Sequence, residues 1–184
     1  MSKLPRALVF DLDGCTWWPE MYHLWGGGGS PFKLCSKTGN VIDRSGTKVE
    51  IMADLRSILQ EVKGDLKWSQ TKIAVASSCD EPSWARECIK LMNIGDNLKL
   101  KDIFDPNLTE IYKGSKSTHL KSISSKSKIG LEDMMFFDNE WGNCQTVAKI
   151  GVTVVYTPKG VTRQLFDEAL SKFPAPGQII GKRR

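Results

Sequence analysis

Short apolar runs alternate with longer stretches of helical periodicity along this chain, and this alternation restricts its fold more than any other feature. Runs that are apolar at nearly every position are typical of strands buried on both faces of a sheet. The chain has four of them: Ala7–Phe10, Ile73–Ala76, Met134–Phe137 and Val152–Tyr156. Other stretches have the apolar spacing of amphipathic helices: Met52–Lys63, Pro82–Met92, Ser117–Ser124, Asn143–Ile150 and Val161–Phe173. This order predicts an α/β fold, a three-layer, doubly wound parallel sheet of Rossmann-like form with helices on both faces.

One segment, residues 17–48, departs from the alternation. It contains four consecutive glycines at 26–29 and the turn signals Ser30-Pro31 and Gly39-Asn40. A phosphate-binding Walker loop would continue into Lys-Ser or Lys-Thr, and neither follows these glycines. We therefore expect a single domain over residues 1–184, with a Gly-rich loop or flap at about 17–48 that has room for a small β-hairpin.

The composition excludes several classes of protein. No apolar run approaches the roughly 20 residues that a membrane-spanning helix needs. The apolar stretch that begins at Ala7 is interrupted by Asp11, so it does not resemble a signal peptide. Five cysteines, an odd number without a CxxC pair, argue against a disulfide framework and a structural zinc site. We expect a cytoplasmic monomer with no membrane partner.

Polar residues directly follow three of the predicted strands. They are Asp11 and Asp13, then Ser77 and Ser78, then Asp138, Asn139 and Glu140. In a doubly wound sheet the functional site lies outside the carboxyl ends of the strands. Asp11 and Asp13 are separated by one residue, so both carboxylates can face the same crevice. Two carboxylates so close repel each other unless a cation or a proton lies between them.

Four of these segments, in this order, resemble the motifs of the haloacid-dehalogenase superfamily of phosphohydrolases. The stretch Val9–Gly14, with sequence VFDLDG, is similar to the first motif, and Ser77 is similar to the second. Lys116 resembles the third motif, and the stretch Phe136–Asn139 the fourth. The chain length, the Trp after the first motif and the stretch 114–119 resemble most closely the capless magnesium-dependent phosphatases. Fewer than forty residues separate Ser77 from Lys116, which leaves no room for a substantial cap domain.

This resemblance implies a Mg²⁺-dependent phosphomonoester hydrolase that works through an aspartyl-phosphate. It implies that Asp11 is the nucleophile and that Asp13 is the general acid and base. The metal ligands would be a side-chain oxygen of Asp11, the backbone carbonyl of Asp13 and a fourth-motif side chain. Ser77 would hydrogen-bond the phosphoryl oxygens, and Lys116 would neutralise the nucleophile and the phosphate.

Two of these assignments have competitors within the chain. Lys113 competes with Lys116 for the third motif, and we favour Lys116 because the stretch Gly-Ser-Lys-Ser sets it at a helix start. At the fourth motif, capless relatives usually have the ligand in the second position, which is Asn139 here. Asp138 would then hold Lys116. An amide oxygen carries no charge, so this substitution is expected to weaken Mg²⁺ binding without abolishing it.

Departures from the family pattern leave the substrate open. Gly14 stands where close relatives have Tyr, and Cys15 stands where the family commonly has Thr or Val. Ser78 stands where those relatives often have Arg, so it is a candidate substrate-binding residue with altered recognition. The resemblance implies phosphotyrosine or sugar-phosphate substrates, on a small molecule or a phosphoprotein. The alternative is a catalytically weak binding module of the same fold.

The net charge of +5 is partly concentrated in an acid-free window, residues 111–131, that contains five lysines. This window is interpreted as a solvated helix face, or else as a rim that attracts phosphate. A nucleic-acid partner is not expected, because Tyr112 is the only aromatic residue in the window.

Overall fold

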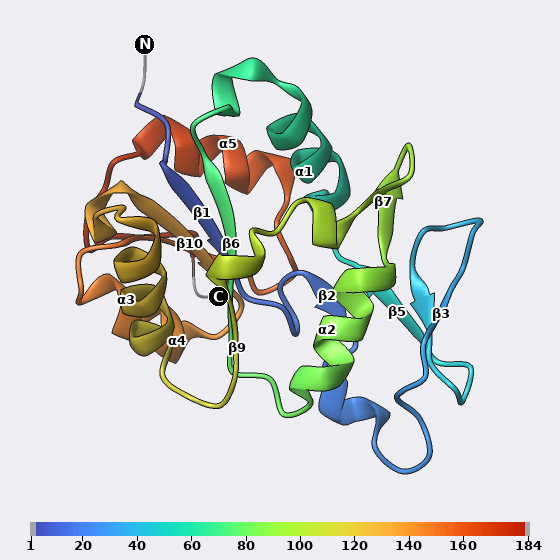
Figure 1. The fold of residues 1–184 in the computed structure, drawn as a ribbon. Coiled ribbons are helices and arrows are strands. Elements are labelled where there is room, and N and C mark those ends of the chain that lie inside the picture. Colours follow the sequence, from blue (N-terminus) through green and yellow to red (C-terminus); the bar gives the residue numbers. More distant parts are fainter. Residues whose placement is uncertain (1–2, 183–184) are drawn as a thin grey trace.

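A six-stranded parallel sheet forms the centre of the molecule, as seen in a computed structural model that describes residues 3–182 (Figure 1). The strand order is β12-β11-β10-β1-β6-β9, and every neighbouring pair is parallel. The strands are β1 Ala7–Phe10, β6 Lys72–Ser77, β9 Thr109–Ile111, β10 Met134–Asp138, β11 Thr153–Tyr156 and β12 Ile179–Ile180. The predicted fold class, with no large cap, is confirmed.

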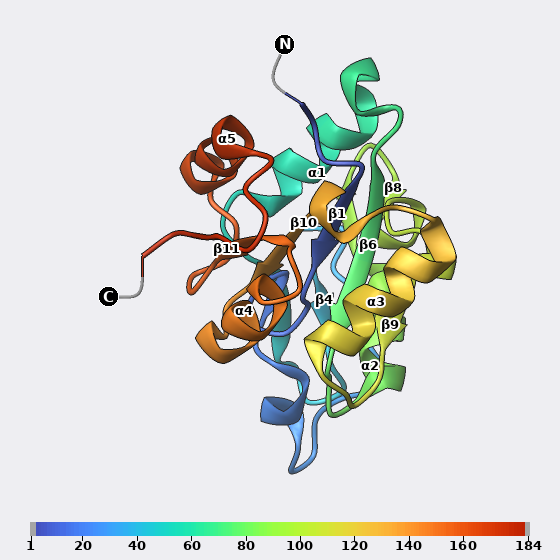
Figure 2. The same ribbon diagram turned by 90° about the vertical axis from the view of Figure 1, so that its left-hand side faces the viewer.

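Helices cover both faces of this sheet (Figures 1 and 2). The α-helices are α1 Leu55–Gly64, α2 Pro82–Leu91, α3 Lys116–Ser127, α4 Trp141–Ala148 and α5 Arg163–Lys172. Apolar residues of α3 and α4 pack on one face, and those of α1, α2 and α5 pack on the other. The short 3-10 helices are η1 Met21–Leu24, η2 Leu66–Trp68, η3 Leu100–Asp102, η4 Pro106–Leu108 and η5 Leu131–Asp133. Within residues 3–182, no helix is long and apolar enough to cross a membrane.

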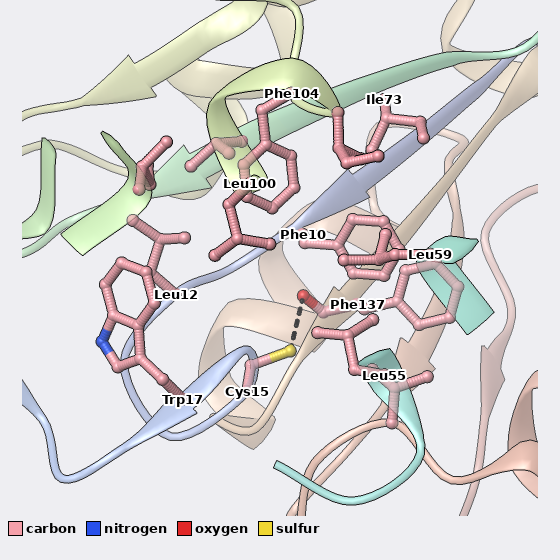
Figure 3. Close-up of a cluster of buried hydrophobic side chains, with 14 of the residues drawn as sticks. Phe10, Leu12, Cys15, Trp17, Leu55, Leu59, Ile73, Leu100, Phe104 and Phe137 are labelled. Atoms are coloured by element: carbon pink, nitrogen blue, oxygen red, sulfur yellow. Dashed lines mark hydrogen bonds between the residues drawn. The ribbon is translucent and has the colours of Figure 1, made fainter. Parts of the chain in front are cut away.

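The central strand β1 contributes side chains to both apolar layers because its alternate side chains point to opposite faces of the sheet. Leu8 and Phe10 belong to the layer shared with α1, whereas Ala7 and Val9 belong to the layer shared with α3 and α4. Figure 3 shows the first layer, in which the rings of Phe10 and Phe137 stack with centroids 4.7 Å apart. The buried core thus fixes β1, and with it the position of the residue that follows, Asp11.

Segment 17–48 contributes most of a second, antiparallel sheet with strand order β2-β5-β4-β3. Its strands are β2 Trp17–Trp18, β3 Lys33–Leu34, β4 Val41–Ile42 and β5 Lys48–Ile51. This sheet is not a separate unit, because Trp17, Val41 and Val49 join the same apolar layer as Phe10. A further hairpin pairs β7 Asn93–Gly95 with β8 Leu98–Lys99.

The helix predicted from Met52 begins three residues later, at Leu55, because β5 continues to Ile51. The edge strands β9 and β12 were not among the four strands predicted by residue range. With three and two residues, they are too short to show a periodicity.

Candidate active site

Three adjacent strands, β10, β1 and β6, end at the same edge of the sheet. Polar residues lie at or directly after the end of each strand. A pocket of about 120 Å³ lies at this edge. Asp11, Asp13, Ser77, Ser78, Lys116 and Asn139 all line it, so the structure brings these predicted residues together. Its other lining residues are Glu20, Cys79, Asp80, Glu140 and Asn143. A volume of this size suits a phosphate group rather than a whole drug-sized ligand.

Lys116 reaches Asp11 from the first turn of α3, where Ser115 caps the helix by accepting a hydrogen bond from the Thr118 N–H. The Lys116 side chain is only 3% exposed, and its Nζ donates to Asp11 Oδ1 and to the Ala76 carbonyl oxygen, at 2.7 Å from the latter. Lys113 instead pairs with Asp80 at the rim of the pocket. Of the two candidate lysines, Lys116 is therefore the one that contacts Asp11.

Asp138 lies behind this pair and is fully buried. Its Oδ2 is 3.5 Å from Lys116 Nζ, and its Oδ1 accepts a hydrogen bond from the Glu140 N–H. Burial lowers the pKa of Lys116, but the charges of Asp11 and Asp138 outweigh burial, so this pKa is raised. Burial and the charge of Asp11 raise the pKa of Asp138, although Lys116 acts against them. Asn143 also donates to Asp138 Oδ2, at 3.1 Å.

The Asp13 carbonyl oxygen and Asp11 Oδ2 both face the side-chain amide of Asn139. With the amide oxygen turned toward them, that oxygen lies 3.1 Å from the Asp13 carbonyl oxygen and 3.3 Å from Asp11 Oδ2. Oxygen acceptors at this distance repel each other unless a proton or a cation lies between them. Ligand oxygens of an octahedral Mg²⁺ at about 2.1 Å are about 3 Å apart at right angles, so the observed separations fit that ion.

The reversed amide orientation is the competing arrangement. It would let the Asn139 NH₂ group donate to both oxygens, at the same 3.1 and 3.3 Å. Within residues 3–182, no three His, Cys, Asp or Glu side chains gather as a metal site. The candidate metal-binding set is therefore one carboxylate, one backbone carbonyl and one amide, which are the hard oxygen donors that Mg²⁺ prefers.

Gly14 makes space for Asn139. Its φ of +77° lies in the left-handed region that favours glycine, and a Cβ there would come within 2.5 Å of Asn139 Nδ2. The departures from the family pattern at Gly14 and at Asn139 therefore lie next to each other, and a side chain at position 14 would collide with Asn139. This spatial relation could not be seen from the sequence.

Asp13 is oriented by the indole of Trp17, whose Nε1–H donates to Asp13 Oδ1 at 2.7 Å. Burial and, to a smaller degree, the Asp11 charge raise the pKa of Asp13 to about 6, although the Trp17 hydrogen bond lowers it. A carboxyl group that titrates near neutrality can both give and accept a proton. The position of this Trp after the first motif is visible in the sequence, but its hydrogen bond to Asp13 is not.

Cys15 and the two serines have distinct surroundings. The Cys15 thiol is fully buried, and its Sγ lies 3.6 Å from the Phe137 carbonyl oxygen (Figure 3). Burial raises the pKa of Cys15. Ser77 is almost fully buried at the end of β6, whereas Ser78 is partly exposed and its Oγ accepts from the Gly114 N–H at 3.3 Å. Cys15 therefore belongs to the packing beneath the site, and both serines line the pocket.

Comparison with known proteins identifies the family of this chain. The sequence matches the acid phosphatase family over residues 3–175. A haloacid-dehalogenase-like hydrolase superfamily protein of Schizosaccharomyces pombe is 33% identical, over 82% of this chain and 84% of that protein. Magnesium-dependent phosphatase 1 of Homo sapiens is 29% identical, over 94% of this chain and 89% of that protein.

A solved structure gives the same fold. It is the N-terminal part of a Bacteroides fragilis protein, containing a phosphatase domain in complex with Mg. Its superposition on this chain has a TM-score of 0.55 at 23% sequence identity. The match covers 83% of this chain but only 36% of the longer Bacteroides chain. Because the family match spans nearly the whole chain, this protein belongs to the acid phosphatase family and is a phosphatase of the haloacid-dehalogenase-like superfamily.

Proposed function

We propose that this phosphatase is a Mg²⁺-dependent phosphomonoester hydrolase that transfers the phosphoryl group to Asp11 and then to water. One observation carries the proposal, namely the different surroundings of the two Asp11 oxygens. Oδ1 is held by Lys116, and Oδ2 faces the Asp13 carbonyl oxygen and the side-chain amide of Asn139. One oxygen is thus available for attack on phosphorus while the other can bind a cation.

Mg²⁺ is the cofactor that fits this site, and it is the metal in the name of the human relative. Asp11 Oδ2, the Asp13 carbonyl and the Asn139 amide oxygen would hold it, with water completing its coordination. When bound, it would neutralise charge on the transferring phosphoryl group. The rest of the chemistry belongs to side chains of this chain.

In the first step, Asp11 Oδ1 attacks phosphorus, and the bond between phosphorus and the ester oxygen breaks. Asp13 gives a proton to the departing alcohol oxygen. In the second step, Asp13 takes a proton from a water molecule, whose oxygen attacks the aspartyl-phosphate and frees inorganic phosphate and Asp11. Lys116 holds a positive charge beside the reacting oxygens throughout, and Ser77 and Ser78 are assigned as phosphate-binding residues.

The charges at the pocket rim narrow the substrate class. Among residues 3–182, every charged residue that lines the pocket apart from Lys116 is an acid: Asp11, Asp13, Glu20, Asp80 and Glu140. Asp80 is paired with Lys113, which leaves Glu20 and Glu140 to face a leaving group. Burial and the charge of Glu140 raise the pKa of Glu20, although His23 acts against them. A leaving group that is neutral or cationic, as in phosphotyrosine or a sugar phosphate, fits better than one with a second anionic group.

The proposal is tested by hydrolysis of p-nitrophenyl phosphate with Mg²⁺, in excess EDTA, and with beryllofluoride, which mimics an aspartyl-phosphate. We expect hydrolysis that requires Mg²⁺ and that beryllofluoride inhibits. Full activity in excess EDTA would contradict the metal requirement. Absence of any turnover with Mg²⁺, on this and on a panel of phosphorylated metabolites, would favour the alternative of a catalytically weak binding module.

A further inference from the structure

His119 lies on α3, one helical turn after Lys116, and is fully buried. Its Nε2 is 3.1 Å from the Tyr112 carbonyl oxygen. Its ring packs edge-on against the Tyr112 ring, with the two ring centroids 4.3 Å apart. A carbonyl oxygen only accepts hydrogen bonds, so Nε2 carries the proton. Nδ1 is buried and has no hydrogen-bond partner among the residues that the structure describes.

A neutral imidazole is the form that this environment supports. Burial and the positive charge of Lys116 lower the pKa of His119, against smaller opposing effects of the Tyr112 carbonyl and of the acids Glu110 and Asp11. The side chain therefore acts as a single hydrogen-bond donor rather than as a charge. The mechanism proposed above makes no use of it.

The bond from His119 ends on a turn, residues 112–115, that joins the phosphate-side residues to one another. The Tyr112 N–H donates to the Ser77 carbonyl at 3.2 Å, and the Gly114 N–H donates to Ser78 Oγ at 3.3 Å. The turn then enters α3 at Lys116 through the Ser115 cap. One short segment thus links Ser77, at the end of β6, and Ser78, which follows it, to the lysine that contacts Asp11.

We propose that His119 is a positioning residue for the phosphate site: its Nε2–H ties α3 to the 112–115 turn and so holds Lys116 in register with Ser77 and Ser78. This inference rests on the proposed function for its effect on catalysis, but not for its effect on the turn itself. A displacement of about 1 Å at a reacting centre can lower a rate about a hundredfold. Loss of the bond is therefore expected to affect turnover more than folding.

The test compares two variants. His119→Leu fills the space of the imidazole but has no hydrogen-bond donor, whereas the amide NH₂ group of His119→Gln can donate to the Tyr112 carbonyl. Ile123→Ala, a truncation in the buried face of the same helix, is the control for simple destabilisation. We expect His119→Leu to lower kcat about tenfold or more and to weaken inhibition by inorganic phosphate. His119→Gln should recover most of both. Ile123→Ala should lower the melting temperature while keeping kcat.

Amide hydrogen exchange gives a readout that does not depend on activity. In His119→Leu, the protection of the Tyr112 and Gly114 amides should fall about tenfold or more, whereas His119→Gln should keep it. Unchanged protection in His119→Leu overturns the inference, as does a kcat that simply follows the melting temperature across the three variants. A wild-type protein without Mg²⁺-dependent hydrolysis would contradict the proposed function, while the exchange data would still decide the role of His119.

Discussion

Asn139 is the residue at which the candidate metal site differs most from the usual family pattern. It supplies an amide oxygen where an acid would add a charge, and Gly14 leaves the space that it occupies. Asp138 is less suited to touch a metal, because its oxygens already face Lys116, Asn143 and the Glu140 N–H. We therefore propose Asn139 rather than Asp138 as the metal ligand from this motif.

Replacing Asn139 with Asp should tighten Mg²⁺ binding. The added charge attracts the cation, and repulsion from Asp11 and Asp13 offsets part of that gain. We expect the half-saturating Mg²⁺ concentration to fall about tenfold, equivalent to about 1.4 kcal/mol. A Mg²⁺ titration at saturating substrate measures it, with Glu140→Gln, a charge change at the rim of the same pocket, as the control. An unchanged midpoint would mean that Asn139 does not touch the metal.

Asp13→Asn should separate substrates by the quality of their leaving group. Loss of the general acid is expected to lower kcat for an alkyl phosphate about 10²- to 10⁴-fold. The first step with p-nitrophenyl phosphate should suffer less, because nitrophenolate departs without a proton. Single-turnover kinetics on both substrates measure the difference. Equal losses on the two would argue against Asp13 as the acid.

At the scale of elements, the small antiparallel sheet depends on one buried acid. Asp43 lies after β4, and its carboxylate accepts hydrogen bonds from the N–H groups of Gly29, at 2.7 Å, and of Ser45 and Thr47, at 2.9 and 2.8 Å. It thereby ties the four-glycine segment to the turn between β4 and β5. Burial raises the pKa of Asp43, but these hydrogen bonds outweigh burial and hold the pKa below its usual value.

Asp43→Asn is therefore expected to lower the free energy of unfolding at pH 7 by about 1 to 3 kcal/mol, since an amide cannot accept all of these bonds. The folded-state pKa of Asp43 is depressed. Its stabilisation is present above the unfolded pKa of about 3.9 and is lost as the pH falls through the folded value. Urea unfolding of wild type and variant from pH 7 to pH 3 measures this, with the exposed Asp96→Asn as the charge control. A difference that stays constant to pH 3 would contradict the assigned role.

The elements that the sequence predicted are those with enough residues to show a period. The four predicted strands and five predicted helices all form, with ends shifted by up to three residues. The strands of segment 17–48 were predicted only as a loop with room for a hairpin. Three of its four strands have two residues each, and the antiparallel pairing of β2 with β5 spans a long sequence separation that local pattern does not encode.

The candidate site was predictable in part for the same reason. Asp11 and Asn139 directly follow strands and Ser77 ends one, so the parallel order of the sheet brings them together. The bonds that orient the site were not visible in advance, because the contact of Trp17 with Asp13 depends on how the chain turns after β1. The role inferred for His119 likewise depends on a backbone carbonyl, and side-chain type alone does not reveal such an acceptor.

At the scale of the whole molecule, we expect one cooperative unit, because the small sheet shares its apolar layer with the main sheet. Urea unfolding followed by far-ultraviolet circular dichroism and by tryptophan fluorescence should give coincident transitions. The midpoint should not change with protein concentration, as expected for a monomer. Two separated transitions would contradict the single domain, and a concentration-dependent midpoint would contradict the monomer.

The central claim, that Asp11 carries the phosphoryl group, is tested most directly by Asp11→Asn. Asn has nearly the same shape, so the fold should be kept, which circular dichroism and the melting temperature verify. An amide oxygen is a far weaker nucleophile than a carboxylate, so turnover of p-nitrophenyl phosphate at saturating Mg²⁺ should fall below detection. A correctly folded Asp11→Asn variant that keeps about a tenth of the wild-type kcat, a loss of only about 1.4 kcal/mol in transition-state stabilisation, would contradict the covalent mechanism.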